Sequence, residues 1–310
     1  MMTRAERVRA ALDGEEVDRP PFCFWHHFRP HGSGRRLAEA TIGFFDEEFD
    51  LDIAKIMPDL PYPFPRGGVR SLDDWHLIVP LAADGGIFRQ RLICIEQLRD
   101  WLGGETPIIY TVFSPLTEAL HAAGGHEAFK RHAAEAPAVI HQALGILASN
   151  LADFSAAAIG AGADGIFLAC QGASADEFSE GEYREFGRPY DLQVLRGADE
   201  GWLNILHVHG ESNLMLDLFL AYPAPVINWS DRLAGPSLAA VRAKTDKTLM
   251  GGLHERGPLT NGTDEQIEAE MRDALAQAGQ TRFILANGCS VPDETPHEVL
   301  RRARAIVDRL

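Results

Sequence analysis

Eight short apolar segments alternate along the chain with longer segments of helical pattern, and this alternation restricts the fold more than any other feature of the sequence. The apolar segments are continuous runs, not strict alternations of apolar and polar residues, which is typical of parallel strands covered on both faces. We therefore expect strands at 21–26, 52–57, 107–113, 164–170, 202–208, 225–229, 248–253 and 282–288.

Helix signals lie between most of these segments. They are Ser33 as an N-cap, Pro137 as a break, Thr263 with Asp264 as caps, Gly279 just past a helix end, and Pro296 at a first helical position. Eight strand and helix units over 310 residues predict an α/β fold, a TIM (β/α)₈ barrel forming a single domain over 1–310.

The competing fold is a doubly wound open sheet, which needs a glycine-rich phosphate turn after its first strand. The corresponding segment, "FCFWHHFRPHGSGRR", contains glycines but no GxGxxG, so we prefer the barrel. The segment 58–106 is rich in proline and glycine and too long for a plain connection, so it predicts an inserted hairpin or loop over the barrel mouth.

Charge and cysteine content exclude several classes of protein. The formal net charge of −16 argues against a nucleic-acid partner. The charged N-terminus has no apolar signal-peptide region, and we expect no segment that reaches the length of a membrane span. The four cysteines are widely spaced and form no CxxC pair, which fits a reducing cytoplasm.

Polar side chains follow almost every predicted strand, where a barrel builds its active site. In strand order they are Trp25, His26 and His27; Asp59; Ser114 and Thr117; Cys170 and Gln171; His207, His209 and Glu211; Asn228, Trp229 and Asp231; His254 and Glu255; Asn287 and Cys289.

The segment "NILHVHGES" places His207 and His209 on the same side of a strand, because residues i and i+2 share a face. Together with Cys289 after the last strand they can supply three ligands to Zn²⁺ and leave a fourth position open, as in catalytic zinc sites. Such a site can activate a thiol or a water molecule. The alternative is that these histidines only bond the backbone and that Cys289 is an inert apolar residue.

The chain resembles the uroporphyrinogen decarboxylase superfamily in "RVRAALDGEEVDRPPFCFW", "GADGIFLACQG", "NILHVHGES" followed by "PVINWSD", and "LMGGL" followed by "FILANGCSVPDETPHEVLRRARAIV". The resemblance runs in the same order over nearly the whole chain. It implies a TIM barrel and, as a family expectation, a homodimer.

True uroporphyrinogen decarboxylases use no metal and carry an "MRQAGR" motif, an aspartate, a tyrosine and a "GHG" histidine. Here "WHHFRP" places His26 where an arginine is expected, His121 stands at the tyrosine position, and Asn287 replaces the histidine. Only Asp59 matches, which counts against this branch.

The second branch resembles zinc-dependent methyltransferases that move methyl groups between corrinoid proteins and thiols such as coenzyme M. Its signature is His-x-Cys on the fifth strand and Cys at the eighth. His207 and Cys289 match it, and His209 replaces the first cysteine, with Glu211 as a candidate fourth ligand. The resemblance therefore implies Zn²⁺ on His207, His209 and Cys289.

Three functions remain open: a zinc-dependent methyltransferase with a small-molecule substrate, a metal-independent decarboxylase centred on Asp59, and a non-enzymatic carrier of a corrinoid or porphyrin. The chain has no "DxHxxG" corrinoid motif, so a corrinoid would arrive on a partner protein. The candidate catalytic residues are Asp59 and Gln171, and the candidate substrate-binding residues are His26, Asn228 and Asn287.

Overall fold

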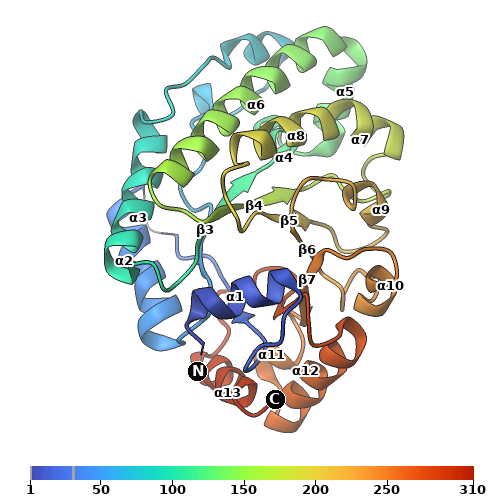
Figure 1. Ribbon diagram of the computed structural model, residues 1–310. Coiled ribbons are helices and arrows are strands. Elements are labelled where there is room, and N and C mark those ends of the chain that lie inside the picture. The colour runs from blue at the N-terminus through green and yellow to red at the C-terminus, as the bar shows by residue number, and fades with distance from the viewer. Residues whose placement is uncertain (1, 30–31) are drawn as a thin grey trace.

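Eight parallel strands form one sheet in the computed structural model, which describes residues 2–29 and 32–310 (Figure 1). Each neighbouring pair is parallel, in the order β1-β8-β7-β6-β5-β4-β3-β2. Between the end strands, the amide of Asp52 donates to the Phe22 carbonyl at 3.0 Å, which nearly closes the barrel. The strands are β1 (Phe22–Cys23), β2 (Ala54–Ile56), β3 (Ile108–Phe113), β4 (Gly165–Cys170), β5 (Ile205–Val208), β6 (Val226–Trp229), β7 (Thr248–Leu253) and β8 (Phe283–Asn287).

Each of the eight predicted strands contains one of these strands, and the expectation of a TIM barrel is confirmed. The strands are buried along almost their whole length, because helices cover their outer faces and side chains fill the interior.

Helices surround the sheet on the outside (Figure 1). They are α1 (Arg4–Asp13), α2 (Gly34–Ile42), α3 (Gly86–Leu102), α4 (Pro115–Ala123), α5 (His126–Glu135), α6 (Pro137–Gly160), α7 (Glu180–Phe186), α8 (Arg188–Gly197), α9 (Leu216–Phe219), α10 (Leu238–Arg242), α11 (Pro258–Asn261), α12 (Asp264–Ala278) and α13 (His297–Val307). The π-helix η1 (Gly43–Glu48) follows α2, and the 3₁₀ helices η2 (Pro65–Gly67) and η3 (Leu72–Leu77) follow β2.

The predicted caps explain several helix ends. Ser33 accepts a hydrogen bond from the Arg36 amide at the start of α2, and Thr263 accepts from the Gln266 amide at the start of α12. Pro137 begins α6 directly after α5, and Pro296 lies one residue before α13 instead of inside it. The segment 58–106, all of which the structure describes, contains η2, η3 and α3. It contains no β-strand, so it is a loop with helices and not a hairpin.

The expectation that no segment reaches the length of a membrane span was wrong. Helix α6 is long and apolar enough to cross a membrane, by length and composition only. An 18-residue window in it has a mean hydropathy of 1.4, and half of that window is buried. The helix packs along α8 in the outer layer of the barrel (Figure 1).

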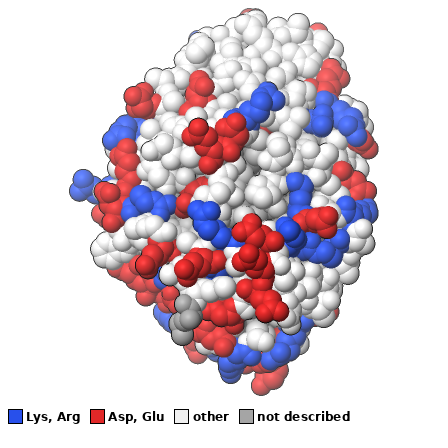
Figure 2. All heavy atoms as spheres, in the orientation of Figure 1, with Lys and Arg blue, Asp and Glu red and all other residues white. Residues whose placement is uncertain are grey.

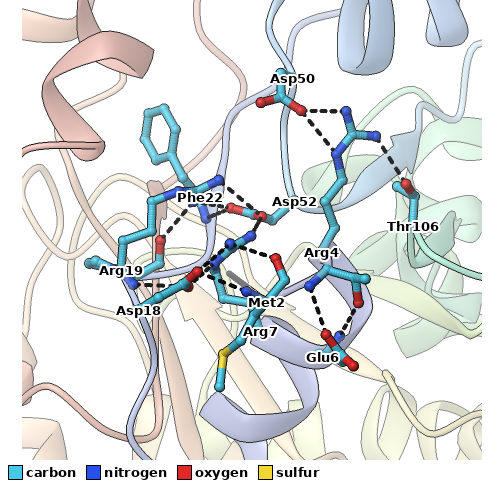
Figure 3. A network of polar contacts seen from close by, with 12 residues as sticks. Met2, Arg4, Glu6, Arg7, Asp18, Arg19, Phe22, Asp50, Asp52 and Thr106 are labelled. Atoms are coloured by element: carbon cyan, nitrogen blue, oxygen red, sulfur yellow. Dashed lines mark hydrogen bonds and ion pairs between the residues drawn. The ribbon is translucent and has the colours of Figure 1, made fainter.

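A buried ion-pair network lies at the amino-terminal end of the strands, under α1 (Figure 3). Asp52 is fully buried and accepts from Arg7 Nη1 at 2.6 Å, from Arg19 Nη1 at 2.5 Å and from the Phe22 amide at 2.8 Å. Basic and acidic side chains are interspersed on the surface around α1 (Figure 2). This end of a barrel supports stability, so the network ties α1 to the sheet.

Candidate metal centre

Three side chains that the sequence predicts as metal ligands meet at the carboxyl ends of β5 and β8. His207 is on β5, His209 follows it, and Cys289 comes two residues after β8. The His209 amide still donates to the Cys170 carbonyl at 3.0 Å, which continues the strand pairing and keeps the two histidines on one face. Ligand atoms of the three side chains all lie within 4.8 Å of one another.

This spacing and this donor set are suited to zinc. Zinc bonds to nitrogen and sulfur of about 2.0–2.3 Å place tetrahedral ligand atoms roughly 3.5 Å apart, so a modest closure of the three side chains would complete the site. Two imidazoles and one thiolate are ligands that Zn²⁺ prefers, and a three-ligand site leaves a position open. The residues therefore fit the metal.

Asn228 on β6 orients the buried ring of His207. Its Oδ1 lies 2.6 Å from His207 Nδ1, and its Nδ2 donates to the carbonyls of Met250 at 2.9 Å and Asn287 at 3.2 Å. Because both carbonyls need a donor, the amide nitrogen must face them, and Oδ1 must accept from Nδ1–H. His207 Nε2 is then the unprotonated nitrogen, as metal binding requires.

Asn287, the last residue of β8, holds the backbone of Cys289. Its Nδ2 donates to the Cys289 carbonyl at 2.6 Å and to the Trp25 carbonyl at 3.4 Å, while its Oδ1 is buried without a partner among the described residues. The two asparagines that were predicted to bind substrate therefore contact the candidate ligands directly.

The electrostatics favour the protonation states that ligate metal. Burial lowers the pKa of both His207 and His209, which keeps the imidazoles neutral. Burial raises the pKa of the Cys289 thiol, whereas the hydrogen bond and positive charge of a protonated His207 lower it, and the pKa lies below the ordinary value, so the protonation of Cys289 is coupled to that of His207.

Lys55 on β2 is a feature that the sequence analysis missed. Its ammonium is buried inside the barrel, donates to Thr111 Oγ1 at 2.8 Å, and lies 4.3 Å from the ring centre of Phe167 and 4.8 Å from that of Trp25. Phe167 in turn stacks on the His207 ring at 5.1 Å. Burial lowers the pKa of Lys55 to about 7, and no ion pair of the described residues includes it.

Asp59 and His26 lie at the mouth but make local contacts. Asp59 accepts from the Phe28 amide at 2.6 Å and the Arg29 amide at 3.2 Å, and its Oδ1 lies 2.5 Å from His27 Nδ1. Burial raises the Asp59 pKa, yet these hydrogen bonds lower it by more, so the carboxylate is ionised and anchors the loop after β1. His26 Nδ1 bonds the His27 carbonyl at 2.8 Å, and its ring packs on aromatic neighbours.

Gln171 and His121 lie together at the ends of β4 and α4. The Gln171 amide donates to Thr117 Oγ1 at 2.8 Å, and Gln171 and His121 line one cavity. From the sequence alone, His121 is notable only because it stands at the tyrosine position of the decarboxylases. In the structure this half-exposed histidine lines a cavity with Gln171, which follows Cys170, whose carbonyl accepts from the His209 amide at 3.0 Å.

Glu211 does not join the cluster. It is exposed and pairs with Arg256 at 2.7 Å, and its carboxylate is not among the ligand atoms that lie within 4.8 Å of one another. Glu255, by contrast, is buried, with Oε1 accepting from Ser230 Oγ at 2.6 Å and Oε2 without a partner among the described residues.

Comparison with known families gives a match to one family model. The model for uroporphyrinogen decarboxylase (URO-D) matches residues 54–310.

Two curated relatives are methyltransferases of Methanosarcina mazei. The methylated-thiol–coenzyme M methyltransferase is 28% identical over 215 residues, which are 67% of this chain and 54% of that protein. The methylcobamide:CoM methyltransferase MtbA is 24% identical over 238 residues, which are 76% of this chain and 68% of that protein. The chain thus spans about half the length of the first of these relatives.

A solved structure supports the fold. A methyltransferase from Methanosarcina mazei superposes with a TM-score of 0.82 at 21% identity, and the match covers 100% of this chain and 99% of that one.

Proposed function

The chain belongs to the uroporphyrinogen decarboxylase family, and from this premise we propose that it is a zinc-dependent methyltransferase. It would move a methyl group between a corrinoid or small methylated donor and a thiol-type acceptor. Its methyltransferase relatives support the reaction class. A corrinoid donor would arrive on a partner protein, since the chain has no "DxHxxG" motif.

One observation carries the proposal: His207, His209 and Cys289, far apart in sequence, bring three ligand atoms within 4.8 Å of one another. Groups of this kind at a barrel mouth are the pattern of a catalytic zinc site with an open position. A metal-binding histidine usually donates its other ring nitrogen to a hydrogen-bond acceptor, and Asn228 Oδ1 is such an acceptor for His207 Nδ1.

The roles of the residues follow from their contacts. A zinc ion held there would lower the pKa of a bound thiol and so supply a thiolate nucleophile at neutral pH. Asn228 fixes the ring of His207, and Asn287 fixes the backbone that carries Cys289. Gln171 and His121 line a cavity beside the cluster and would orient the substrate.

The test is the zinc content of the purified protein, measured by plasma mass spectrometry beside Cys289→Ser. We expect close to one zinc per chain in the wild type and loss of zinc in the variant. Cys94→Ser is the matched control, because Cys94 is buried in α3 away from the cluster and should leave zinc content unchanged. Stoichiometric zinc in Cys289→Ser would refute the ligand assignment.

A methyl-transfer assay with a methylcorrinoid donor and a thiol acceptor then tests the reaction itself. The competing decarboxylase needs no metal and depends on Asp59. Turnover of uroporphyrinogen by metal-depleted protein, abolished in Asp59→Asn, would replace the methyltransferase proposal. We expect no such turnover, because the Asp59 carboxylate is already occupied by His27, Phe28 and Arg29.

A further inference from the structure

A cavity of about 450 Å³ lies at the carboxyl ends of β2 and β3, between the loop after β2 and the helices α3 and α4. Its walls are mainly aromatic and apolar, with Tyr62, Phe64 and Phe113 among the lining side chains. The volume is in the range of small-molecule sites, which pair apolar walls with a few polar groups that fix the ligand.

Two opposite charges line this cavity without pairing. Arg91 on α3 is 3% exposed and donates through Nε and Nη2 to the Leu60 carbonyl, at 3.0 and 2.7 Å. No ion pair among the described residues includes it. Glu118 on α4 is 4% exposed, and its nearest basic atom is His121 Nδ1 at 4.0 Å. The Arg91 guanidinium also lies over the rings of Phe88, Tyr110 and Phe154, and its charge lowers the pKa of Glu118 without a direct ion pair. Buried charges are normally paired, and a ligand can supply the carboxylate that Arg91 lacks and the ammonium that Glu118 lacks.

The pair of charges restricts the chemistry of that ligand. A simple cation would pair with Glu118 but be repelled by Arg91. A simple anion would pair with Arg91 but be repelled by Glu118. A zwitterion satisfies both. We propose that this cavity binds the head group of an amino-acid-type substrate, with its ammonium on Glu118, its carboxylate on Arg91 and its methylene groups against the aromatic walls.

The burial and titration of Glu118 agree with this assignment. Burial raises the pKa of Glu118 to about 7, although the charge of Arg91 lowers it, because no hydrogen bond among the described residues offsets the lost hydration of the carboxylate. An ammonium group would supply that donor and favour the ionised form.

His121 connects the cavity to the candidate metal centre. It lines this cavity and also a neighbouring one of about 370 Å³ that includes Gln171. Gln171 directly follows Cys170, whose carbonyl accepts from the His209 amide at 3.0 Å, so the second cavity lies beside the candidate metal centre. A head group on Glu118 and Arg91 would leave the sulfur end of a short side chain free to extend past His121 toward the three ligands. This last step rests on the proposed methyltransferase function, whereas the head-group site does not.

The experiment measures binding by calorimetry with three probes: L-methionine, L-methioninol, which lacks the carboxylate, and N-acetyl-L-methionine, which lacks the ammonium. We expect L-methionine to bind about 10- to 100-fold more tightly than either analogue, as loss of a charged hydrogen bond implies. Glu118→Gln should weaken L-methionine and L-methioninol by a similar factor and leave N-acetyl-L-methionine unchanged. Glu127→Gln, on the exposed side of α5, is the matched control and should change nothing.

Equal binding of the three probes, no binding of L-methionine, or no effect of Glu118→Gln would overturn the proposal. Glu118→Asp, which keeps the charge, should recover part of the affinity if the variants fold alike. Repeating the titrations in Cys289→Ser separates the two proposals. Binding retained in that variant supports the head-group site even if the metal assignment fails.

Discussion

The side-chain oxygen of Asn228 lies 2.6 Å from His207 Nδ1, and the other end of the same amide is held by two backbone carbonyls. Since the amide can satisfy all three partners in only one orientation, the tautomer of His207 is set by the neighbouring strand before any ligand arrives. The unprotonated Nε2 is thereby available to a metal ion.

Replacing Asn228 by Ala should weaken zinc binding about 10- to 100-fold, because the His207 ring loses the contact that orients it. Competition with a chromophoric chelator measures this affinity. Asn204→Ala is a matched control: Asn204 is also buried and bonds the Ile166 amide, but it lies at the start of β5, away from the cluster. Equal affinity in the two variants would show that Asn228 has no part in metal binding.

His209→Cys should keep stoichiometric metal, since cysteine thiolates and histidine imidazoles are both common zinc ligands in proteins. With cobalt in place of zinc, we expect a stronger thiolate-to-metal charge-transfer band than in the wild type, because two sulfurs replace one. Ser212→Cys, on the exposed loop just beyond, should leave the band unchanged. An unaltered spectrum in His209→Cys would remove His209 from the ligand set.

The barrel could be predicted because the strands of a parallel sheet are covered on both faces and therefore consist of continuous apolar runs. Each of the eight expected segments contains a strand. The grouping of His207, His209 and Cys289 followed from the same topology, which brings all strand ends to one mouth. The positions of the strand ends in the sequence were thus enough to predict which side chains gather at the barrel mouth.

Contacts that depend on side-chain direction could not be predicted. Lys55 sits in an otherwise apolar run, and nothing in that run distinguishes an inward ammonium from one at the surface. Glu211 is close to the histidines in sequence, yet the loop turns it outward to Arg256. Arg91 and Glu118 come from different helices, so only the packing of those helices reveals that they line one cavity.

Asp52→Asn should lower the free energy of unfolding by roughly 3 kcal/mol, because it removes the one fully buried counter-charge of Arg7 and Arg19. Their remaining partners, Asp18 for Arg7 and Asp308 for Arg19, are both partly exposed. Urea denaturation measures the change. Glu268→Gln breaks an exposed pair with Arg272 on α12 and should cost only about 0.3–0.5 kcal/mol. A similar small cost for Asp52→Asn would mean that the network under α1 does not stabilise the barrel.

Lys55→Met should stabilise the protein near neutral pH, and the gain should shrink as the pH rises. Burial lowers the Lys55 pKa from 10.5 to about 7, so between these values the unfolded chain binds one more proton than the folded one. Raising the pH therefore favours folding of the wild type, and the penalty of the buried charge is complete only below about pH 7. The methionine variant avoids a cost of roughly 4 kcal/mol there and almost none near pH 10.5.

Urea denaturation of both proteins at about pH 6.5 and about pH 9.5 tests this dependence. Lys244→Met, which removes an exposed pair with Asp217, is the matched control and should change the unfolding free energy by less than about 1 kcal/mol at either pH. If Lys55→Met were instead destabilising at both pH values by a similar amount, the contact of the ammonium with Thr111 and the two aromatic rings would outweigh its lost hydration. Lys55 would then be an ordinary stabilising cation of the core, and its charge would be present in the barrel interior throughout the neutral range.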